Sequence, residues 1–388
     1  MSTRWKFALL GASCFAVLLA ACGGGGGGGG GAAVQLPLMQ LNDTGISADQ
    51  CFAAGSTAFV ACSSPQARAL SATQDGQLGR DAVATTNSNS DGKLGFQFSA
   101  VPGGCVHDEV TGLTWESKTA DGGLRDGTLG YTKYGDGRPG DATEFVAAVN
   151  LAGLCGAADW RLPTLQELYS VFDFGAMYDA PPFIDQTWFP NTRQAHYWTS
   201  DQFPSIFGRS PGRYWIRFYR VGLQVSEGQP DQTYGVRLVR GGNVLVPADT
   251  RFSPSADAQE VTDAQTGLIW RRCAEGTQFL AGSCTGTFMY VSHEEAMRLA
   301  TTRAAAAGVG WRLPNAKELL SLTQTGRFPA RDMVAFPETL ASNGFGRWAS
   351  TSCGNGAAAF SDFESSGTIS CLARVIKSGG VQLVRDPS

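Results

Sequence analysis

The sequence predicts an α+β protein with two tandem domains, each made of two helices, a small and mostly antiparallel sheet, and long loops. Three observations predict this class. A set of short motifs occurs twice in the same order, helix-capping signatures occur twice in each copy, and short strand-like segments follow the second helix of each copy. Glycine is abundant, with 50 of 388 residues, and charged residues make up only 16%, which is typical of a loop-rich exported protein.

Residues 1–21 are predicted to be a secretory signal peptide. Arg4 and Lys6 provide a positive start, and residues 7–19 form an apolar run that is too short to span a bilayer comfortably. The sequence LAAC at residues 19–22 is typical of a lipoprotein signal, in which the protein is cut before the cysteine and the thiol is acylated. We therefore expect an exported protein that is anchored to membrane lipid through Cys22.

Residues 22–45 are predicted to be a flexible linker. Nine glycines run from Gly23 to Gly31, and a run without side chains cannot join a core. The linker should hold the folded part away from the membrane surface. Gly23, rather than an aspartate, follows Cys22, which favours the outer membrane as the destination. The sequence leaves open whether the protein faces the periplasm or the cell surface.

The charge of the mature chain is mildly acidic. Loss of Arg4 and Lys6 with the signal changes the formal charge from −4 to −6. An acidic protein does not offer the basic surface that nucleic acids require, so a nucleic-acid partner is not expected.

Eight cysteines remain after Cys14 leaves with the signal and Cys22 takes lipid. An even number of cysteines in an oxidising compartment predicts disulfides. The cysteines fall into four local pairs, although spacing alone does not fix their connectivity: Cys51 with Cys62, Cys105 with Cys155, Cys273 with Cys284, and Cys353 with Cys371. A zinc site is not expected, because the chain has no Cys-x-x-Cys motif and its histidines, His107, His196 and His293, are scattered.

The internal repeat defines the domains. The sequence TGLTW at 111–115 matches TGLIW at 266–270, and WRLP occurs at 160–163 and again at 311–314. WTS at 198–200 then corresponds to WAS at 348–350, and VRLVR at 236–240 corresponds to VQLVR at 381–385. The spacings are similar in the two copies. We predict repeat 1 over 46–245, including an N-terminal extension, and repeat 2 over 246–388.

Capping boxes predict two helices in each repeat. Asp141 with Glu144, and Ser292 with Glu295, open the first helix of repeats 1 and 2. Thr164-x-x-Glu167 and Asn315-x-x-Glu318 open the second helix. The repeated glutamates therefore have a structural role that needs no catalysis. The shared tryptophans, which we expect in the core, are Trp115, Trp160, Trp198, Trp270, Trp311 and Trp348.

A strand over 214–220 is the strongest candidate for ligand binding. Its alternation places Trp215, Arg217 and Tyr219 on one face. If that face is exposed, the rings can stack on a sugar and the guanidinium can bind a carboxylate or sulfate. Trp188, which like Trp215 has no counterpart in repeat 2, is a further candidate, and Arg213 and Arg209 are candidate helpers. The alternative is that these side chains pack against the core and a neighbouring loop.

Several motifs together resemble a known family. "CVHDEVTGLTWESKT", "LCGAADWRLPTLQEL", "YWTS" and "YGVRLVRG" are similar to the C-terminal domain of the Legionella collagen-like protein, and both repeats carry the pattern. The RLPT element and the terminal GVRLVR are also similar to the formylglycine-generating branch of the C-type-lectin-like folds. The resemblance implies two C-type-lectin-like domains, a Cys105–Cys155 disulfide, and a role in surface adhesion and glycan binding. This chain has no collagen-like stalk, and its repeat 2 lacks the basic-aromatic strand.

The stretch from Asp121 to Asp141 is the candidate site for calcium. It is rich in aspartate and glycine, which suits an oxygen-ligated calcium loop but does not follow the EF-hand spacing. Turn chemistry explains the same composition. No other cofactor is expected.

The sequence thus predicts a lipid-anchored, non-enzymatic binding or adhesion protein of the cell envelope, with a glycan or another envelope component as its partner. The alternative is a structural envelope protein whose repeats serve assembly, for instance as a trimer. A divergent enzyme is the third interpretation; the sequence shows no nucleophile with a base, metal set or cofactor loop to favour it.

Overall fold

The computed structural model describes residues 40–79, 82, 95–178, 181–203, 212–217, 230–242, 246–338, 346–354, 356–362 and 368–387. The predicted signal peptide, Cys22 and the glycine run lie outside these residues. Residues 37–388 form one compact unit, which contains both repeats.

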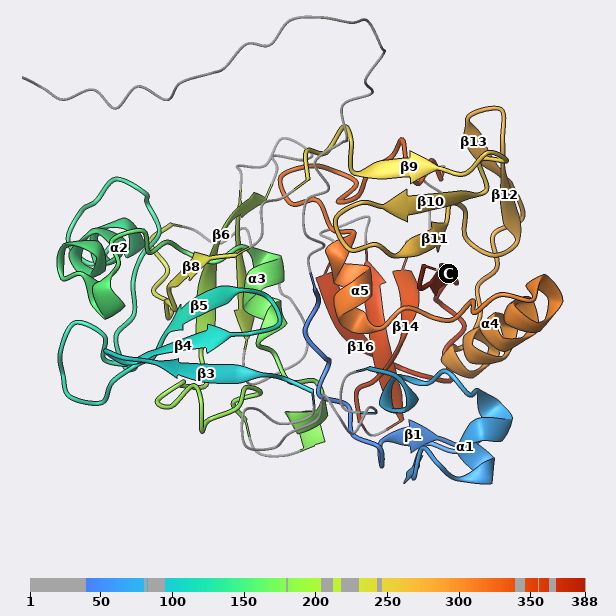
Figure 1. The fold of residues 1–388 in the computed structure, drawn as a ribbon, viewed down its shortest axis with the longest axis horizontal. Coiled ribbons are helices and arrows are strands. Elements are labelled where there is room, and N and C mark those ends of the chain that lie inside the picture. The colour runs from blue at the N-terminus through green and yellow to red at the C-terminus, as the bar shows by residue number, and fades with distance from the viewer. Residues whose placement is uncertain are drawn as a thin grey trace, which may run out of the picture. The chain divides into compact units, whose positions relative to one another are not determined.

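After its N-terminal extension, the described part of repeat 1 combines short strands with two α-helices (Figure 1). Its elements in chain order are β3 (Phe98–Val101), β4 (Cys105–Asp108), β5 (Leu113–Glu116), α2 (Ala142–Leu151), the 3₁₀ turn η2 (Leu154–Gly156), α3 (Leu165–Ser170), the 3₁₀ turn η3 (Gly175–Tyr178), β6 (His196–Phe203), β7 (Gly212–Arg217) and β8 (Val239–Gly241).

Repeat 2 follows the same plan with one added hairpin. Its elements are β9 (Phe252–Pro254), β10 (Glu260–Asp263), β11 (Ile269–Arg271), the hairpin strands β12 (Thr277–Leu280) and β13 (Ser283–Gly286), α4 (His293–Ala307), α5 (Ala316–Ser321), β14 (Gly346–Ser352), β15 (Ala357–Asp362), β16 (Thr368–Ala373) and β17 (Val384–Arg385).

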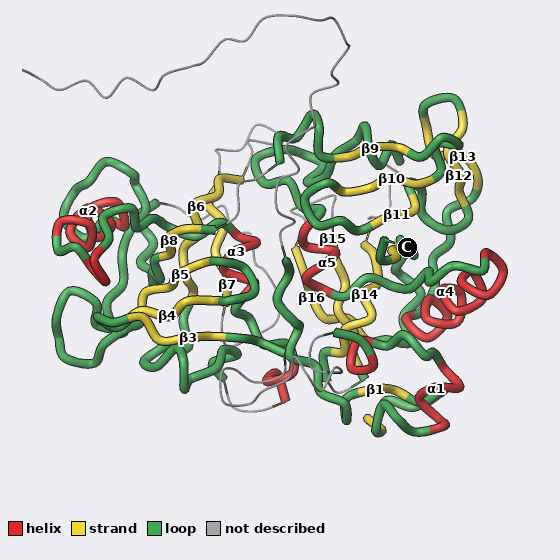
Figure 2. Tube along the Cα trace, viewed as in Figure 1, coloured by secondary structure: helices red, strands yellow, loops and turns green. Residues whose placement is uncertain are grey.

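Among the described residues, each repeat has a larger and a smaller antiparallel sheet, and repeat 2 has the two-stranded β12-β13 hairpin in addition. The larger sheets have the orders β3-β4-β5-β8 and β9-β10-β11-β17, in which equivalent strands occupy equivalent places. The smaller sheets are β6-β7 and β14-β15-β16. Loops join most elements, as Figure 2 shows. The predicted α+β class and tandem arrangement are confirmed.

The order of elements differs from the expectation that helices precede the sheet. In both repeats the strands carrying the TGLTW and TGLIW motifs come before the first helix, and of the larger sheet only the last strand, β8 or β17, follows the second helix. Of the VRLVR motif at 236–240, only the last two residues belong to a strand, because β8 begins at Val239, while Gly235 makes an isolated bridge to Tyr197. All four residues of strand β5 are buried, although its sequence alternates apolar and polar residues.

The predicted helix caps are present. Ser292, Thr164 and Asn315 each accept a hydrogen bond from the backbone N–H three residues later, and Glu295, Glu167 and Glu318 complete the boxes. Asp141 is likewise an N-cap, but it binds the N–H of Thr143, and the carboxylate of Glu144 accepts from Gly140 instead. The first box is therefore only partly formed.

The shared tryptophans and the cysteines stabilise the repeats internally. All six shared tryptophans are at most 3% exposed, which confirms their core role. The four predicted disulfides are present, joining Cys51 to Cys62, Cys105 to Cys155, Cys273 to Cys284, and Cys353 to Cys371.

An N-terminal extension, residues 40–79, lies against both repeats. It contains β1 (Cys51–Phe52), β2 (Phe59–Val60), α1 (Pro65–Leu70) and the 3₁₀ turn η1 (Asp75–Gln77). Ile46 joins a core cluster that contains residues of both repeats, whereas Phe52 packs into the core of repeat 2. The extension also bonds to each repeat, since Asn42 donates to Asp108 and Thr351 donates to Asp75.

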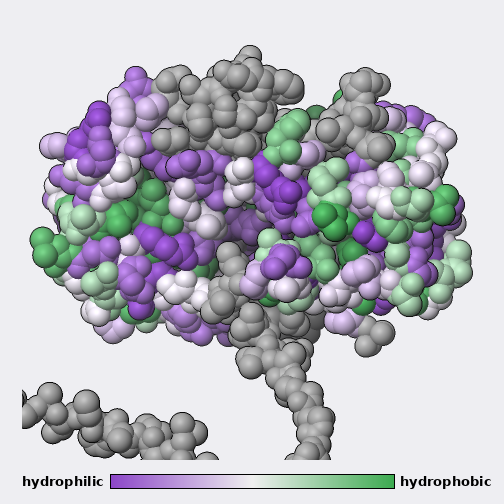
Figure 3. All heavy atoms as spheres, turned by 90° about the horizontal axis from the view of Figure 1, so that it is seen from above, coloured by the Kyte–Doolittle hydropathy of each residue, from purple (hydrophilic) through white to green (hydrophobic). Residues whose placement is uncertain are grey.

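Within the part of the chain that the structure describes, no helix is long and apolar enough to cross a membrane. On the face shown in Figure 3, hydrophobic residues form small groups among hydrophilic ones.

Candidate functional site

The predicted ligand-binding strand is only partly described. Strand β7 carries Arg213, Trp215 and Arg217, and it pairs with β6 in the register Gln202 with Arg213 and Trp198 with Trp215. Tyr219 and Arg209 lie outside the described residues. Whether the Trp215 face is exposed stays a prediction.

Trp188 is half-buried and is not a freely exposed ring. It packs against the core cluster that contains residues of both repeats, with its ring centroid 6.0 Å from that of Phe98 on β3. The structure therefore gives Trp188 a packing role on the side of the larger sheet.

The aspartate-rich stretch 121–141 uses its carboxylates in turns. Asp121 accepts from the N–H of Gly123 and the hydroxyl of Thr119, and Asp126 accepts from Gly122 and Thr128. These bonds lower the pKa of Asp126 to about 2, with the Thr128 hydroxyl as the largest cause. Among the described residues, no group of three or more acidic, histidine or cysteine side chains is placed to hold a metal. Turn formation is thus what the structure shows for this composition.

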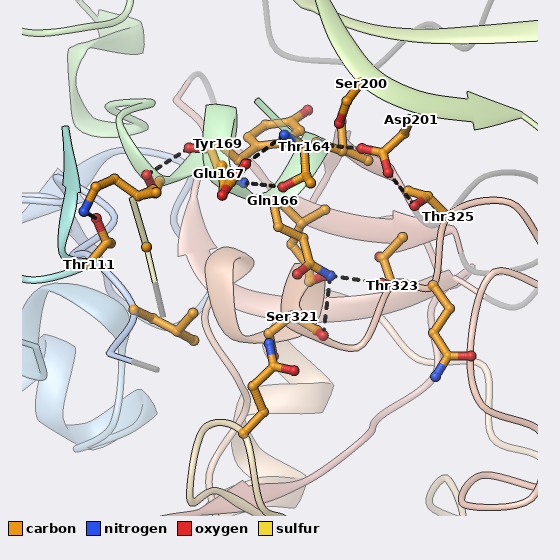
Figure 4. A pocket seen from close by; sticks show the side chains of 18 of the residues that line it. Thr111, Thr164, Gln166, Glu167, Tyr169, Ser200, Asp201, Ser321, Thr323 and Thr325 are labelled. Carbon is orange, nitrogen blue, oxygen red and sulfur yellow. Dashed lines mark hydrogen bonds between the residues drawn. The ribbon is translucent and has the colours of Figure 1, made fainter. Parts of the chain in front are cut away.

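A cleft between the repeats is the candidate site that the structure reveals. It has a volume of about 880 Å³ and is lined from both sides. Repeat 1 contributes the WRLP segment, α3 and the middle of β6, and repeat 2 contributes the end of α5 and the loop after it. We call this the cleft; Figure 4 shows it from close by, with Thr164, Gln166 and Ser200 on one side and Ser321 and Thr325 on the other.

Direct bonds between the repeats hold the cleft together. The side-chain amide of Gln166 donates to the carbonyls of Ser321 and Thr323, at 3.4 and 2.7 Å (Figure 4). Asp201 on β6 accepts from the Thr325 hydroxyl at 2.5 Å and also from the N–H of Leu165, the first residue of α3. Helices α3 and α5 contact each other, and their leucines share one core cluster. The two walls therefore form one packed structure rather than two loosely linked domains.

The WRLP arginine and the capping glutamate form an ion pair in each repeat. In repeat 1, Arg161 donates two hydrogen bonds to Glu167, at 2.7 and 2.6 Å, and this pair lines the cleft. In repeat 2, Arg312 makes the same two bonds to Glu318. The Glu167 bonds raise the pKa of Arg161 further, so the guanidinium is permanently charged.

A buried lysine lies at one side of the cleft. Lys317 donates to the backbone carbonyls of Asp43 and Ser170, which joins the extension, repeat 1 and repeat 2 at one atom. Burial lowers the pKa of Lys317 to about 7, although nearby carboxylates, Asp43 first, oppose the shift. Burial likewise raises the pKa of Asp75 to about 7, assisted by the negative charge of Asp43.

The chemistry of the lining suits binding. Several of its charged groups are already engaged: Glu167 with Arg161, Asp201 with Thr325, and Arg251 with Asp263. Apolar side chains, among them Leu41, Leu162 and Val246, leave partly exposed surface in the cleft. Apolar walls with a few directed polar groups are typical of sites for small ligands.

The repeated motifs did not predict the cleft, because many of its polar residues, such as Gln166 and Thr323, belong to none of them. Some residues of the repeated motifs do line it, among them Thr111 of TGLTW, Arg161 of WRLP and Ser200 of WTS. A comparison of the two repeats position by position around that arginine would have found it.

Comparison with known families identifies both repeats. The model described as the Lcl C-terminal domain matches residues 104–240 and residues 259–385, which together are more than half of the chain. Neither the search of curated proteins nor the search of solved structures found a significant match.

Proposed function

The chain belongs to the Lcl C-terminal domain family through its two tandem copies, and we propose that it is a lipid-anchored, non-enzymatic binding protein of the cell envelope whose ligand occupies the cleft. The observation that carries this proposal is the cleft itself, with about 880 Å³ lined by both repeats. A volume of this size accommodates a small molecule or a few sugar rings.

The packing between the repeats supports a binding role. Binding to a preformed site costs less free energy than binding to a site that must first become ordered. The Gln166 and Asp201 bonds and the shared core supply such a preformed site, because they hold both walls without a ligand.

Glycans are the first class of ligand to test. The family resemblance implies a C-type-lectin-like fold and glycan binding, and the basic-aromatic strand β7 lies in repeat 1, beside β6, whose residues line the cleft. Both candidate sites can be examined in one binding experiment.

The test is a glycan array probed with the full-length protein in lipid nanodiscs. Ser200 is exposed and lines the cleft, so S200W should fill it. Ala305 is exposed on α4 and does not line the cleft, so A305W adds the same indole elsewhere. We expect binding by the wild type and A305W and at least a tenfold loss in S200W. Binding that S200W leaves intact would exclude the cleft, and silence of the folded wild type on all glycans would favour the assembly alternative over glycan adhesion.

The lipid anchor is tested separately. Mass spectrometry of the amino-terminal peptide should find Cys22 as the first residue and an added mass of several acyl chains. The C22A variant should keep its signal peptide and carry no lipid. An unmodified Cys22 in the mature wild type would contradict the anchor.

A further inference from the structure

The two Arg–Glu pairs of the chain differ in one additional partner. On Arg312, the same Nη2 atom that binds Glu318 also donates to a second carboxylate, that of Asp386, at 3.2 Å. On Arg161, the Nη2 atom that binds Glu167 donates instead to the neutral backbone carbonyl of Gly241, also at 3.2 Å.

Gly241 and Asp386 occupy equivalent positions. Val239 pairs with Trp115 and bridges to Arg161, and Val384 pairs with Trp270 and bridges to Arg312. The residues two positions later are therefore Gly241 and Asp386. Repeat 2 supplies a carboxylate to its arginine from the chain, and repeat 1 has a glycine in that place.

The two arginines also differ in exposure. The side chains of Arg312 and Glu318 are each 10% exposed, whereas that of Arg161 is 43% and that of Glu167 is 19% exposed. Glu167 is the one carboxylate in ion-pair contact with Arg161 among the described residues. The side chain of Arg161, which lines the cleft, is thus accessible, whereas the side chain of Arg312 is covered.

Two leucine side chains lie near the Arg161–Glu167 pair. Leu162 follows it in the chain and lines the cleft. Leu113 and Glu167 both lie close to Gly242. A Cβ atom placed on Gly242 would be 2.8 Å from a methyl carbon of Leu113 and 3.7 Å from a carboxylate oxygen of Glu167. A ligand group bound to Arg161 would therefore continue into a cleft with hydrocarbon walls.

We propose that Arg161 binds the carboxylate of an organic acid with an apolar body, and that this carboxylate takes the place that Asp386 occupies on Arg312. Repeat 2 shows this arrangement, because Arg312 binds the carboxylates of both Glu318 and Asp386. The planar guanidinium group has several N–H donors that suit carboxylates. The inference rests on the proposed function, because it names the class of ligand that the cleft holds.

The experiment measures binding of 4-phenylbutyrate, 4-phenylbutyramide and glucuronate to the full-length protein in nanodiscs by isothermal titration calorimetry, with empty nanodiscs as the blank. The first two probes share an apolar body and differ in charge, and glucuronate has the charge on a polar body. We expect the acid to bind at least tenfold more tightly than its amide, and more tightly than glucuronate.

Two variants at position 241 form a matched pair. Gly241 has a φ of +71°, and a Cβ there would come to 3.2 Å from the Gly112 carbonyl, so any side chain carries a cost. Asp and Asn have nearly the same shape, so both substitutions carry the same cost and differ only in charge. G241D should abolish the preference for acid over amide by supplying the carboxylate itself, and G241N should keep the preference.

A double variant provides a second test that does not depend on position 241. In R161Q/E167Q both charges are removed together, and the glutamine at 167 can still complete the capping box. We expect this variant to bind acid and amide equally while remaining folded by circular dichroism.

The outcomes separate the inference from the proposed function. If the wild type binds acid and amide equally and S200W binds neither, the role of Arg161 is overturned and the cleft remains the binding site. Tighter binding of glucuronate would overturn the apolar body and favour an acidic sugar. Failure of all three probes would overturn the inference, and the glycan array would then decide on the cleft alone.

Discussion

The duplicated Arg–Glu pair allows one stability prediction to be worked out within a single chain. R312Q leaves Glu318, whose side chain is 10% exposed, without its cation, and it also removes the partner of Asp386. Loss of one partner from a buried pair costs about 3 to 5 kcal/mol, because the remaining charge is desolvated and unpaired. R161Q removes the partner of Glu167 from a pair that is only partly buried, so water can replace the lost hydrogen bonds to Glu167. Such pairs contribute up to about 1 kcal/mol.

Urea unfolding followed by tryptophan fluorescence measures both variants against the wild type, with the disulfides intact. The core tryptophans of both repeats report on the transition. We expect R312Q to lower the free energy of unfolding by about 2 to 4 kcal/mol more than R161Q does. Equal losses, or a larger loss in R161Q, would refute the view that Arg161 is open to solvent while Arg312 is sealed.

Three further predictions follow from the structure. Replacing Cys105 and Cys155 by alanine removes a cross-link over 50 residues and should lower the free energy of unfolding by about 4 kcal/mol, and a loss under about 1 kcal/mol in urea would contradict this. Asp75 has its pKa raised by burial to about 7, so the folded state holds a proton that the unfolded state releases above its ordinary pKa; stability should fall between about pH 4 and pH 7, and D75N should remove that part of the slope. His293 has its pKa lowered by burial to about 3, so its ring signals in an NMR titration should stay constant from pH 5 to pH 8; a midpoint near 6.5 would show that the ring is exposed.

Local signals in the sequence predicted local structure well. The box Thr164 to Glu167 depends on four adjacent residues, so its pattern survives in any context that forms a helix. The disulfides were also predictable, because each pair lies within one segment or one repeat. The strands before the first helix were missed because they are short: β5 alternates apolar and polar residues, but over only four positions.

Tertiary contacts account for what the sequence could not predict. The extension has no helix or strand pattern that points to a partner, yet Asn42 binds Asp108 of repeat 1 and Asp75 binds Thr351 of repeat 2. The cleft likewise depends on hydrogen bonds from Gln166 to carbonyls at the end of α5 and just after it, which are 154 to 157 positions away in the chain. Backbone carbonyls are present at every residue, so no pattern of side chains marks them as partners.

The proposed organic acid binds between the two repeats. Photolabelling with 4-benzoylbenzoate, an aromatic carboxylic acid that cross-links to nearby C–H bonds, tests this placement most directly on the full-length protein in nanodiscs. Mapped by mass spectrometry, the cross-links should fall in both walls of the cleft, within residues 161–170 and 320–327, and excess 4-phenylbutyrate should compete with them. Labelling confined to residues 212–217, or spread without competition over the surface, would contradict the account.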